Sequence, residues 1–101
     1  MEIGTLEDEL AKWHEKKYGS SKIDVPKTMR KLGEEFGEFI EAVMGGNPAK
    51  ISEEATDVMF VMMHIVRQFD GPGALESASE TKLKEIFYRL YHGKPSYSRL
   101  G

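Results

Sequence analysis

The sequence contains no cysteine among its 101 residues. This absence excludes disulfide bonds and thiolate metal sites, so any bound metal must take oxygen or imidazole ligands. Small domains in oxidising compartments commonly depend on disulfides, and their absence fits a reducing compartment. We therefore expect a cytoplasmic protein whose stability comes from one modest hydrophobic core.

Excess positive charge and long apolar runs are also lacking. The 14 basic residues are scattered and the formal net charge is -3, so the sequence lacks the electropositive surface of a duplex-binding protein. The longest apolar stretch, Val58 to Val66, is interrupted by His64 and is too short to span a bilayer. The amino terminus lacks the basic start and apolar run of a secretion signal. We predict no membrane partner and no duplex nucleic-acid partner.

No segment alternates polar and apolar residues with the period of two that β-strands show. Apolar residues instead recur at helical spacing in four segments that glycine and proline separate. The sequence predicts an all-α fold with helices over about 5–18, 26–44, 48–70 and 74–91, a loose tail over 93–101, and a single domain over 1–101. The predicted amino-terminal caps are Thr5 with Asp8, Asp24, and Asn47.

The short connection at Gly45-Gly46-Asn47 predicts that the second and third helices form an antiparallel hairpin, the centre of a four-helix, bundle-like protomer. The spacing of apolar residues gives the expected core positions of the second helix, which are Met29, Leu32, Phe36, Phe39 and Val43.

The third helix is apolar almost all round between Val58 and Val66, so it needs cover on several sides. Three short companion helices can hardly provide that cover. We therefore predict a homodimer or homotetramer that completes its core by association, with this helix at or near the subunit interface. The alternative is a monomer in which Met59 and Met63 fill an irregular core.

Two pairs of acidic residues have the spacing i, i+3. Glu35 and Glu38 lie on the second predicted helix, and Glu54 and Asp57 lie on the third, so the members of each pair share one helix face. In an antiparallel hairpin the two pairs either converge on one side or both turn away, and the sequence leaves this open. If they turn away, they form a solvated acidic stripe, which is ordinary in a chain with 17 acidic residues.

Convergence would make these four carboxylates a cation site. Two carboxylates about 4 Å apart repel by about 4 kcal/mol at an effective dielectric of about 20, and a divalent cation relieves that repulsion. Oxygen ligands suit Mg²⁺ or Mn²⁺ better than Zn²⁺. A two-iron site is disfavoured, because it needs a histidine three residues after a glutamate, where Asp57 stands.

Two basic residues of the fourth predicted helix could complement such a cation. Lys82 and Arg89 lie seven residues apart, so they share one face and stand about 10 Å apart along the axis. This span suits a polyphosphate, although two cations on an exposed helix are more often part of a solvated surface.

Four motifs of the sequence resemble the MazG-like branch of the all-α nucleoside triphosphate pyrophosphatase superfamily, over roughly residues 6–91. The motifs are WHEKKYG, KLGEEFGEFIEA, EEATDV, and LESASETK with an arginine seven residues beyond. In that family the E-x-x-E and E-x-x-D pairs bind Mg²⁺, which here are Glu35, Glu38, Glu54 and Asp57. Members typically continue the last helix as K-x-x-x-N-x-x-R, whereas this chain has Ile86 in place of the asparagine.

The resemblance implies Mg²⁺-dependent hydrolysis of a nucleoside triphosphate, a canonical or modified dNTP, to the monophosphate and pyrophosphate. The metal would neutralise the phosphates and lower the pKa of a bound water, and Glu34 or Glu38 would take the proton of that water. Lys31, Lys82 and Arg89 would face phosphate oxygens.

The base of the nucleotide would stack on Trp13, together with His14 or Tyr18. The alternative for Trp13 is a place in the core, because a tryptophan on an amphipathic helix is usually buried. His64 lies within an apolar run and is expected to be a core histidine.

Two rival functions stay open. Phosphoribosyl-ATP pyrophosphatase belongs to the same superfamily and has a similar K-x-G-E-E-x-x-E motif. It usually shows a histidine four residues after the final aspartate, and Val61 at that position argues against it. The other rival is a non-catalytic helical dimer that senses a nucleotide or binds a protein, and the departure at Ile86 keeps this rival open.

Overall fold

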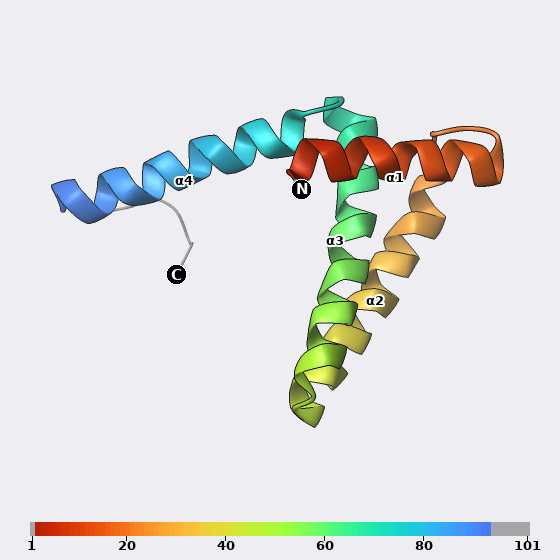
Figure 1. The fold of residues 1–101 in the computed structure, drawn as a ribbon, viewed down its shortest axis with the longest axis horizontal. Helices are drawn as coiled ribbons and strands as arrows, with labels where there is room; N and C mark the ends of the chain where they lie inside the picture. The colour runs from red at the N-terminus through yellow and green to blue at the C-terminus, as the bar shows by residue number, and fades with distance from the viewer. Residues whose placement is uncertain (1, 94–101) are drawn as a thin grey trace.

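The computed structural model describes residues 2–93 and contains four helices: α1 (Ile3–Tyr18), α2 (Val25–Gly45), α3 (Pro48–Asp70) and α4 (Ala74–His92) (Figure 1). The described part of the chain contains no strand, so the predicted all-α fold is confirmed. The predicted tail over 93–101 lies outside the described residues except for Gly93, whose N–H donates to the carbonyl of Arg89 at 3.0 Å. Of these four helices, none is both long and apolar enough to cross a membrane.

Two of the predicted helix caps are confirmed. The side chain of Asp24 accepts from the N–H of Lys27 at 3.1 Å, and the side chain of Asn47 accepts from the N–H of Lys50 at 3.2 Å. The predicted capping box at Thr5 is wrong, because α1 already begins at Ile3 and Glu2 precedes it without a side-chain cap. The N–H of Gly4 instead points to the carboxylate of Glu76 in α4, at 3.4 Å.

Helices α2 and α3 lie side by side and antiparallel, as the short connection predicted (Figure 1). The chain reverses at Gly46, which adopts a φ of 74°. This left-handed conformation favours glycine, and it lets the Gly46 N–H donate to the carbonyls of Ala42 and Val43, both at 3.1 Å. The turn of the hairpin is therefore set by a local signal, a glycine at position 46, that can be recognised in the sequence.

Helix α1 crosses the carboxyl-terminal part of α3 (Figure 1). The contact includes a carboxylate, because Glu7 of α1 is only 2% exposed. Glu7 accepts from the guanidinium of Arg67 in α3 at 2.8 Å and from the N–H of Gly73 at 3.1 Å. Asp8 accepts from the same guanidinium at 2.8 Å. One buried acid thus joins α1, α3 and the connection to α4.

The core of one protomer is small. Its buried apolar residues are Ala11, Ala42, Val58, Val61 and Met63. Three positions of α2 that were expected in the core, Met29, Phe36 and Val43, are about half exposed, so that prediction is wrong for the isolated protomer. Its Cα radius of gyration is 16.0 Å, larger than the roughly 13 Å of a compact 100-residue domain, because the helices do not close around one centre.

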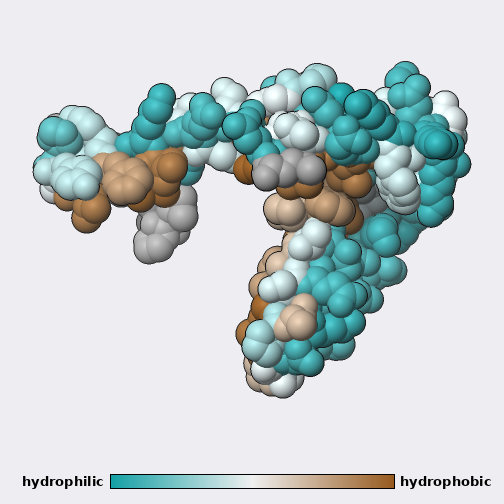
Figure 2. Space-filling view, in the orientation of Figure 1, coloured by the Kyte–Doolittle hydropathy of each residue, from teal (hydrophilic) through white to brown (hydrophobic). Residues whose placement is uncertain are grey.

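Helix α4 contacts the rest of the molecule only near its beginning. Among the described residues it approaches α1 and α3 but not α2, and its carboxyl-terminal end projects away from the hairpin (Figure 1). None of its residues is buried. Figure 2 shows apolar side chains along the side of α4 that faces the open angle toward the hairpin. The large exposed side chains of this helix are Leu83, Ile86, Phe87, Tyr88, Leu90 and Tyr91.

Candidate active site

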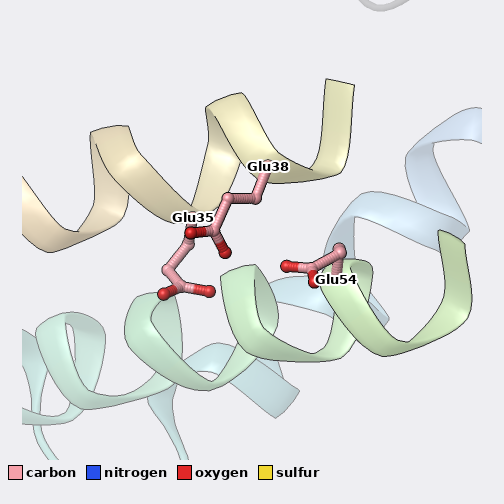
Figure 3. Close-up of side chains that lie close together, drawn as sticks. All are labelled: Glu35, Glu38 and Glu54. Carbon is pink, nitrogen blue, oxygen red and sulfur yellow. The ribbon is translucent and has the colours of Figure 1, made fainter. Parts of the chain in front are cut away.

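Three of the four predicted metal ligands lie together between the two helices of the hairpin. Carboxylate oxygens of Glu35 and Glu38 from α2 and of Glu54 from α3 lie within 4.8 Å of one another, as Figure 3 shows. The acidic pairs therefore converge, which the sequence could not decide. Asp57 lies outside this group of three, which we call the carboxylate cluster. It is one turn beyond Glu54, and its negative charge contributes to raising the pKa of Glu38.

A lysine stands one helical turn before an acid of the cluster on each helix. The Lys31 ammonium lies 3.3 Å from Oε1 of Glu35, and the Lys50 ammonium lies 3.0 Å from Oε1 of Glu54. The hydrogen bond to Glu54 also raises the pKa of Lys50 above its ordinary value. The cluster is therefore flanked by one ammonium group on each helix, and each of them offsets part of its negative charge.

Among the described residues, Glu38 is the acid of the cluster that pairs with no lysine, and its carboxylate lies beside that of Glu54. The negative charge of Glu35 raises the pKa of Glu38, and a hydrogen bond that protonated Glu38 can donate to Glu54 raises it further. The Glu54 side chain is 6% exposed, and its Oε2 atom is buried without a hydrogen-bond partner in the described structure. A buried carboxylate oxygen normally has a donor or a cation beside it, so this atom is suited to a metal ion.

A pocket of about 750 Å³ opens beside the cluster, with Glu35 and Asp57 in its lining. Its volume falls within the roughly 300–1,000 Å³ of small-molecule sites. Three helices and the α1–α2 connection contribute lining residues: Trp13, His14 and Tyr18 from α1; Lys22 and Ile23 from the connection; Lys27, Thr28 and Lys31 from α2; Phe60, Val61 and His64 from α3.

Five aromatic side chains line this pocket, and four of them, Trp13, His14, Tyr18 and His64, lie ring against ring. The rings of His14 and Tyr18 have centroids 4.7 Å apart, and those of His14 and His64 have centroids 4.9 Å apart. Trp13 meets Tyr18 edge-on at 6.2 Å. Trp13 is 51% exposed, so the alternative that placed it in the core is wrong. The expectation of a core histidine at position 64 is also wrong, because His64 lines the pocket; partial burial, and then the charges of His14 and Arg67, lower its pKa.

The basic residues of α4 do not reach the cluster within one protomer. Lys82 and Arg89 instead lie 3.5 Å and 3.4 Å from Oε2 of Glu85 on the same helix. Glu34, one of the two predicted proton acceptors, is exposed and belongs neither to the cluster nor to the pocket lining. The other, Glu38, is part of the cluster.

Sequence reasoning missed three lysines near the site. Lys50 could have been found, because Lys31-x-x-x-Glu35 and Lys50-x-x-x-Glu54 repeat the same spacing on both helices of the hairpin. Lys22 and Lys27 carried no comparable signal. Their place in the pocket depends on how the connection after α1 runs, which is a tertiary feature.

Comparison with known proteins agrees with this geometry. The family model described as phosphoribosyl-ATP pyrophosphohydrolase matches residues 4–70, which contain the cluster and most of α1 to α3 but not α4. A phosphoribosyl-ATP pyrophosphatase of Methanosphaerula palustris is 43% identical over 44 residues. The matched segment is 44% of this chain and 44% of that protein, so the chain matches less than half of its relative. No solved structure matches the chain.

These matches confirm the predicted superfamily, since phosphoribosyl-ATP pyrophosphohydrolases belong to the all-α nucleoside triphosphate pyrophosphatases. They favour phosphoribosyl-ATP pyrophosphatase over the MazG-like branch, although Val61 argued against that enzyme. A single position is weak grounds for excluding a relative, and here Val61 is a buried residue that lines the pocket beside His64. The chain belongs to the phosphoribosyl-ATP pyrophosphohydrolase family.

Proposed function

We propose that the protein hydrolyses phosphoribosyl-ATP to phosphoribosyl-AMP and pyrophosphate with the help of a divalent cation. In this reaction a water oxygen attacks the α-phosphorus, the bond from that phosphorus to the oxygen bridging to the β-phosphorus breaks, and pyrophosphate leaves. The observation that carries the proposal is the convergence of Glu35, Glu38 and Glu54 beside a pocket of nucleotide size. The family match and the name of the relative support the choice of substrate.

The cation would be held by Glu35, Glu38, Glu54 and Asp57. The buried, unpartnered Oε2 of Glu54 and a set of oxygen donors fit a hard ion, Mg²⁺ or Mn²⁺. When bound, such an ion supplies charge neutralisation on the phosphates and a lower pKa for a coordinated water.

The protein's own groups would then position the substrate and accept a proton. Glu38 is the favoured acceptor, because its carboxylate belongs to the cluster, whereas Glu34 is exposed outside it and is the second choice. Lys31 lies between the pocket and the cluster and would bind a phosphate oxygen. Trp13 would stack on the base, since it is exposed within the aromatic part of the pocket.

A second copy of the chain would complete the site. Lys82 and Arg89 stand on a helix that leaves its own hairpin, so they would bind phosphate oxygens only at the cluster of a partner. The exposed apolar side chains of α4 support such an association, in a homodimer or homotetramer.

Hydrolysis of canonical or modified dNTPs is a second candidate function. One residue favours it over phosphoribosyl-ATP: Val61 lines the pocket at the position where the phosphoribosyl-ATP enzymes usually have histidine. Ile86 on α4, where the MazG-like enzymes usually have asparagine, favours neither substrate and indicates only an altered contact from α4.

The test is release of pyrophosphate, measured with Mg²⁺ on phosphoribosyl-ATP, ATP and a panel of canonical and modified dNTPs. We expect the highest kcat/KM on phosphoribosyl-ATP and a loss of about 100-fold or more in Glu38→Gln, the scale of general base catalysis. Glu41→Gln changes an exposed acid on the same helix and should keep full activity. Turnover of dNTPs alone would select the second candidate. If no nucleotide is turned over, the remaining function is that of a non-catalytic helical dimer.

A further inference from the structure

The end of the pocket remote from the carboxylate cluster is cationic. Lys22, in the connection between α1 and α2, and Lys27, in the first turn of α2, both line it. Neither ammonium has a carboxylate oxygen within 4.0 Å among residues 2–93, whereas Lys31 in the same pocket is paired with Glu35. Two unpaired cations in a ligand-sized pocket indicate an anionic group of the ligand.

These lysines stand well away from the place of the triphosphate. Lys27, Lys31 and Glu35 follow one another at intervals of four residues, so they share a stripe of α2 and advance about 6 Å per step. Lys27 is therefore about 12 Å along the helix axis from Glu35. A phosphate bound at the cluster is too far away to reach Lys27 as well, so the anion at this end must be another group.

One acid also lines this end of the pocket, but it is already engaged. The Asp24 carboxylate caps α2 by accepting from the Lys27 N–H at 3.1 Å. Two ammonium groups against one carboxylate leave a net positive charge, to which the amino-terminal end of the α2 dipole adds. Electrostatics at this end therefore favours an anion.

The aromatic side chains lie at the same end as the two lysines. His64 follows Asp57 by seven residues on α3, which is about 10 Å along its axis, toward the end where α1 crosses. His14 and Tyr18 of α1 stand against it, at 4.9 Å for the first pair of rings and 4.7 Å between His14 and Tyr18. A flat base that stacks here has its phosphates toward the cluster and its outer edge beside Lys22 and Lys27.

Resting on the function proposed above, we infer that Lys22 and Lys27 bind the phosphate of the second ribose of phosphoribosyl-ATP and thereby select this substrate over ATP. Phosphoribosyl-ATP is ATP that carries a phosphorylated ribose on its adenine, so it has an anion beyond the base as well as the triphosphate. ATP has only the triphosphate and leaves both lysines without a partner.

The test compares phosphoribosyl-ATP with ATP in the double variant Lys22→Gln/Lys27→Gln. We expect KM for phosphoribosyl-ATP to rise about tenfold or more, the effect of losing a hydrogen bond between charged groups. The kcat on that substrate and the KM for ATP should stay unchanged. Lys16→Gln, which changes an exposed lysine outside the pocket, is the matched control, and Lys22→Arg/Lys27→Arg should restore most of the affinity. Equal losses on both substrates, or no loss on either, would overturn the inference.

A binding measurement separates this inference from the proposed reaction. Calorimetry with phosphoribosyl-AMP and AMP needs neither turnover nor the triphosphate. We expect the wild type to bind phosphoribosyl-AMP more tightly than AMP and the glutamine variant to bind the two alike. If the wild type binds them equally, the inference fails even where hydrolysis is observed. If hydrolysis is absent but phosphoribosyl-AMP still binds more tightly in a lysine-dependent way, the proposed function fails and the phosphate site stands.

Discussion

Among single residues, Glu54 has the most distinctive environment. Its carboxylate is nearly buried, Lys50 holds one oxygen, and the other has no partner in the described structure. A cation bound at that oxygen stabilises only the folded state. We predict that millimolar Mg²⁺ or Mn²⁺ raises the melting temperature, with about 2.7 kcal/mol gained at a concentration one hundred times Kd. Glu54→Gln should abolish the rise.

The adjacent residue supplies the control for this measurement. Glu53 is exposed and lies outside the carboxylate cluster, so Glu53→Gln should keep the full response to Mg²⁺. Differential scanning calorimetry with and without metal would show both effects. A midpoint that does not respond to metal in the wild type would mean that the converging acids are only a solvated stripe.

At this scale the sequence predicted which acids share a helix face, but not which acids from the two helices come together. The i, i+3 spacing placed Glu35 with Glu38 on one face and Glu54 with Asp57 on another, because helix geometry is local. It could not predict that Glu35, Glu38 and Glu54 converge while Asp57 stands apart. That result depends on the rotation of two helices about their axes, which packing of the whole hairpin determines.

At the scale of helices, a partly buried group of ion pairs joins α1 to α3. Arg67 of α3 joins Glu7 and Asp8 of α1, and Glu7 is buried. We predict that Arg67→Met lowers the free energy of unfolding by about 3–5 kcal/mol, because it leaves a buried carboxylate without its cation. Lys12→Met, which removes a cation from the exposed pair with Glu9, should cost at most about 1 kcal/mol. Urea denaturation would measure the free energy of unfolding of both variants. A loss in Arg67→Met as small as that in Lys12→Met would contradict the prediction.

The helix bounds were predictable because the signals that set them are local. Asp24 and Asn47 cap their helices with their own side chains, and Gly46 supplies the left-handed turn of the hairpin. The start of α1 was not predictable in the same way. The N–H of Gly4 in its first turn donates to Glu76, which lies 72 residues away in sequence.

At the scale of the whole molecule, the orientation of α4 relative to the hairpin could not be predicted from the sequence. Its apolar residues recur at helical spacing and predicted the fourth helix of a bundle-like protomer, yet the structure leaves the large ones from Leu83 onward exposed. Periodicity shows that a helix has an apolar face but not which chain covers that face. An uncovered 19-residue helix in water is marginally stable, so the extended α4 itself argues for a partner.

We predict from this shape that the wild type is a dimer or tetramer at micromolar concentration, in sedimentation velocity experiments. Leu83→Asp/Leu90→Asp places charges at two α4 positions that are 55% and 69% exposed in the protomer. Burying these charges in an interface is costly, so the variant should sediment as a monomer and lose helical circular dichroism from α4. Ser79→Asp/Lys84→Asp adds charge at polar positions of the same helix and should stay associated. A wild type that sediments as a folded monomer at every concentration would show that α4 needs no partner, and Lys82 and Arg89 would then have no route to the carboxylate cluster.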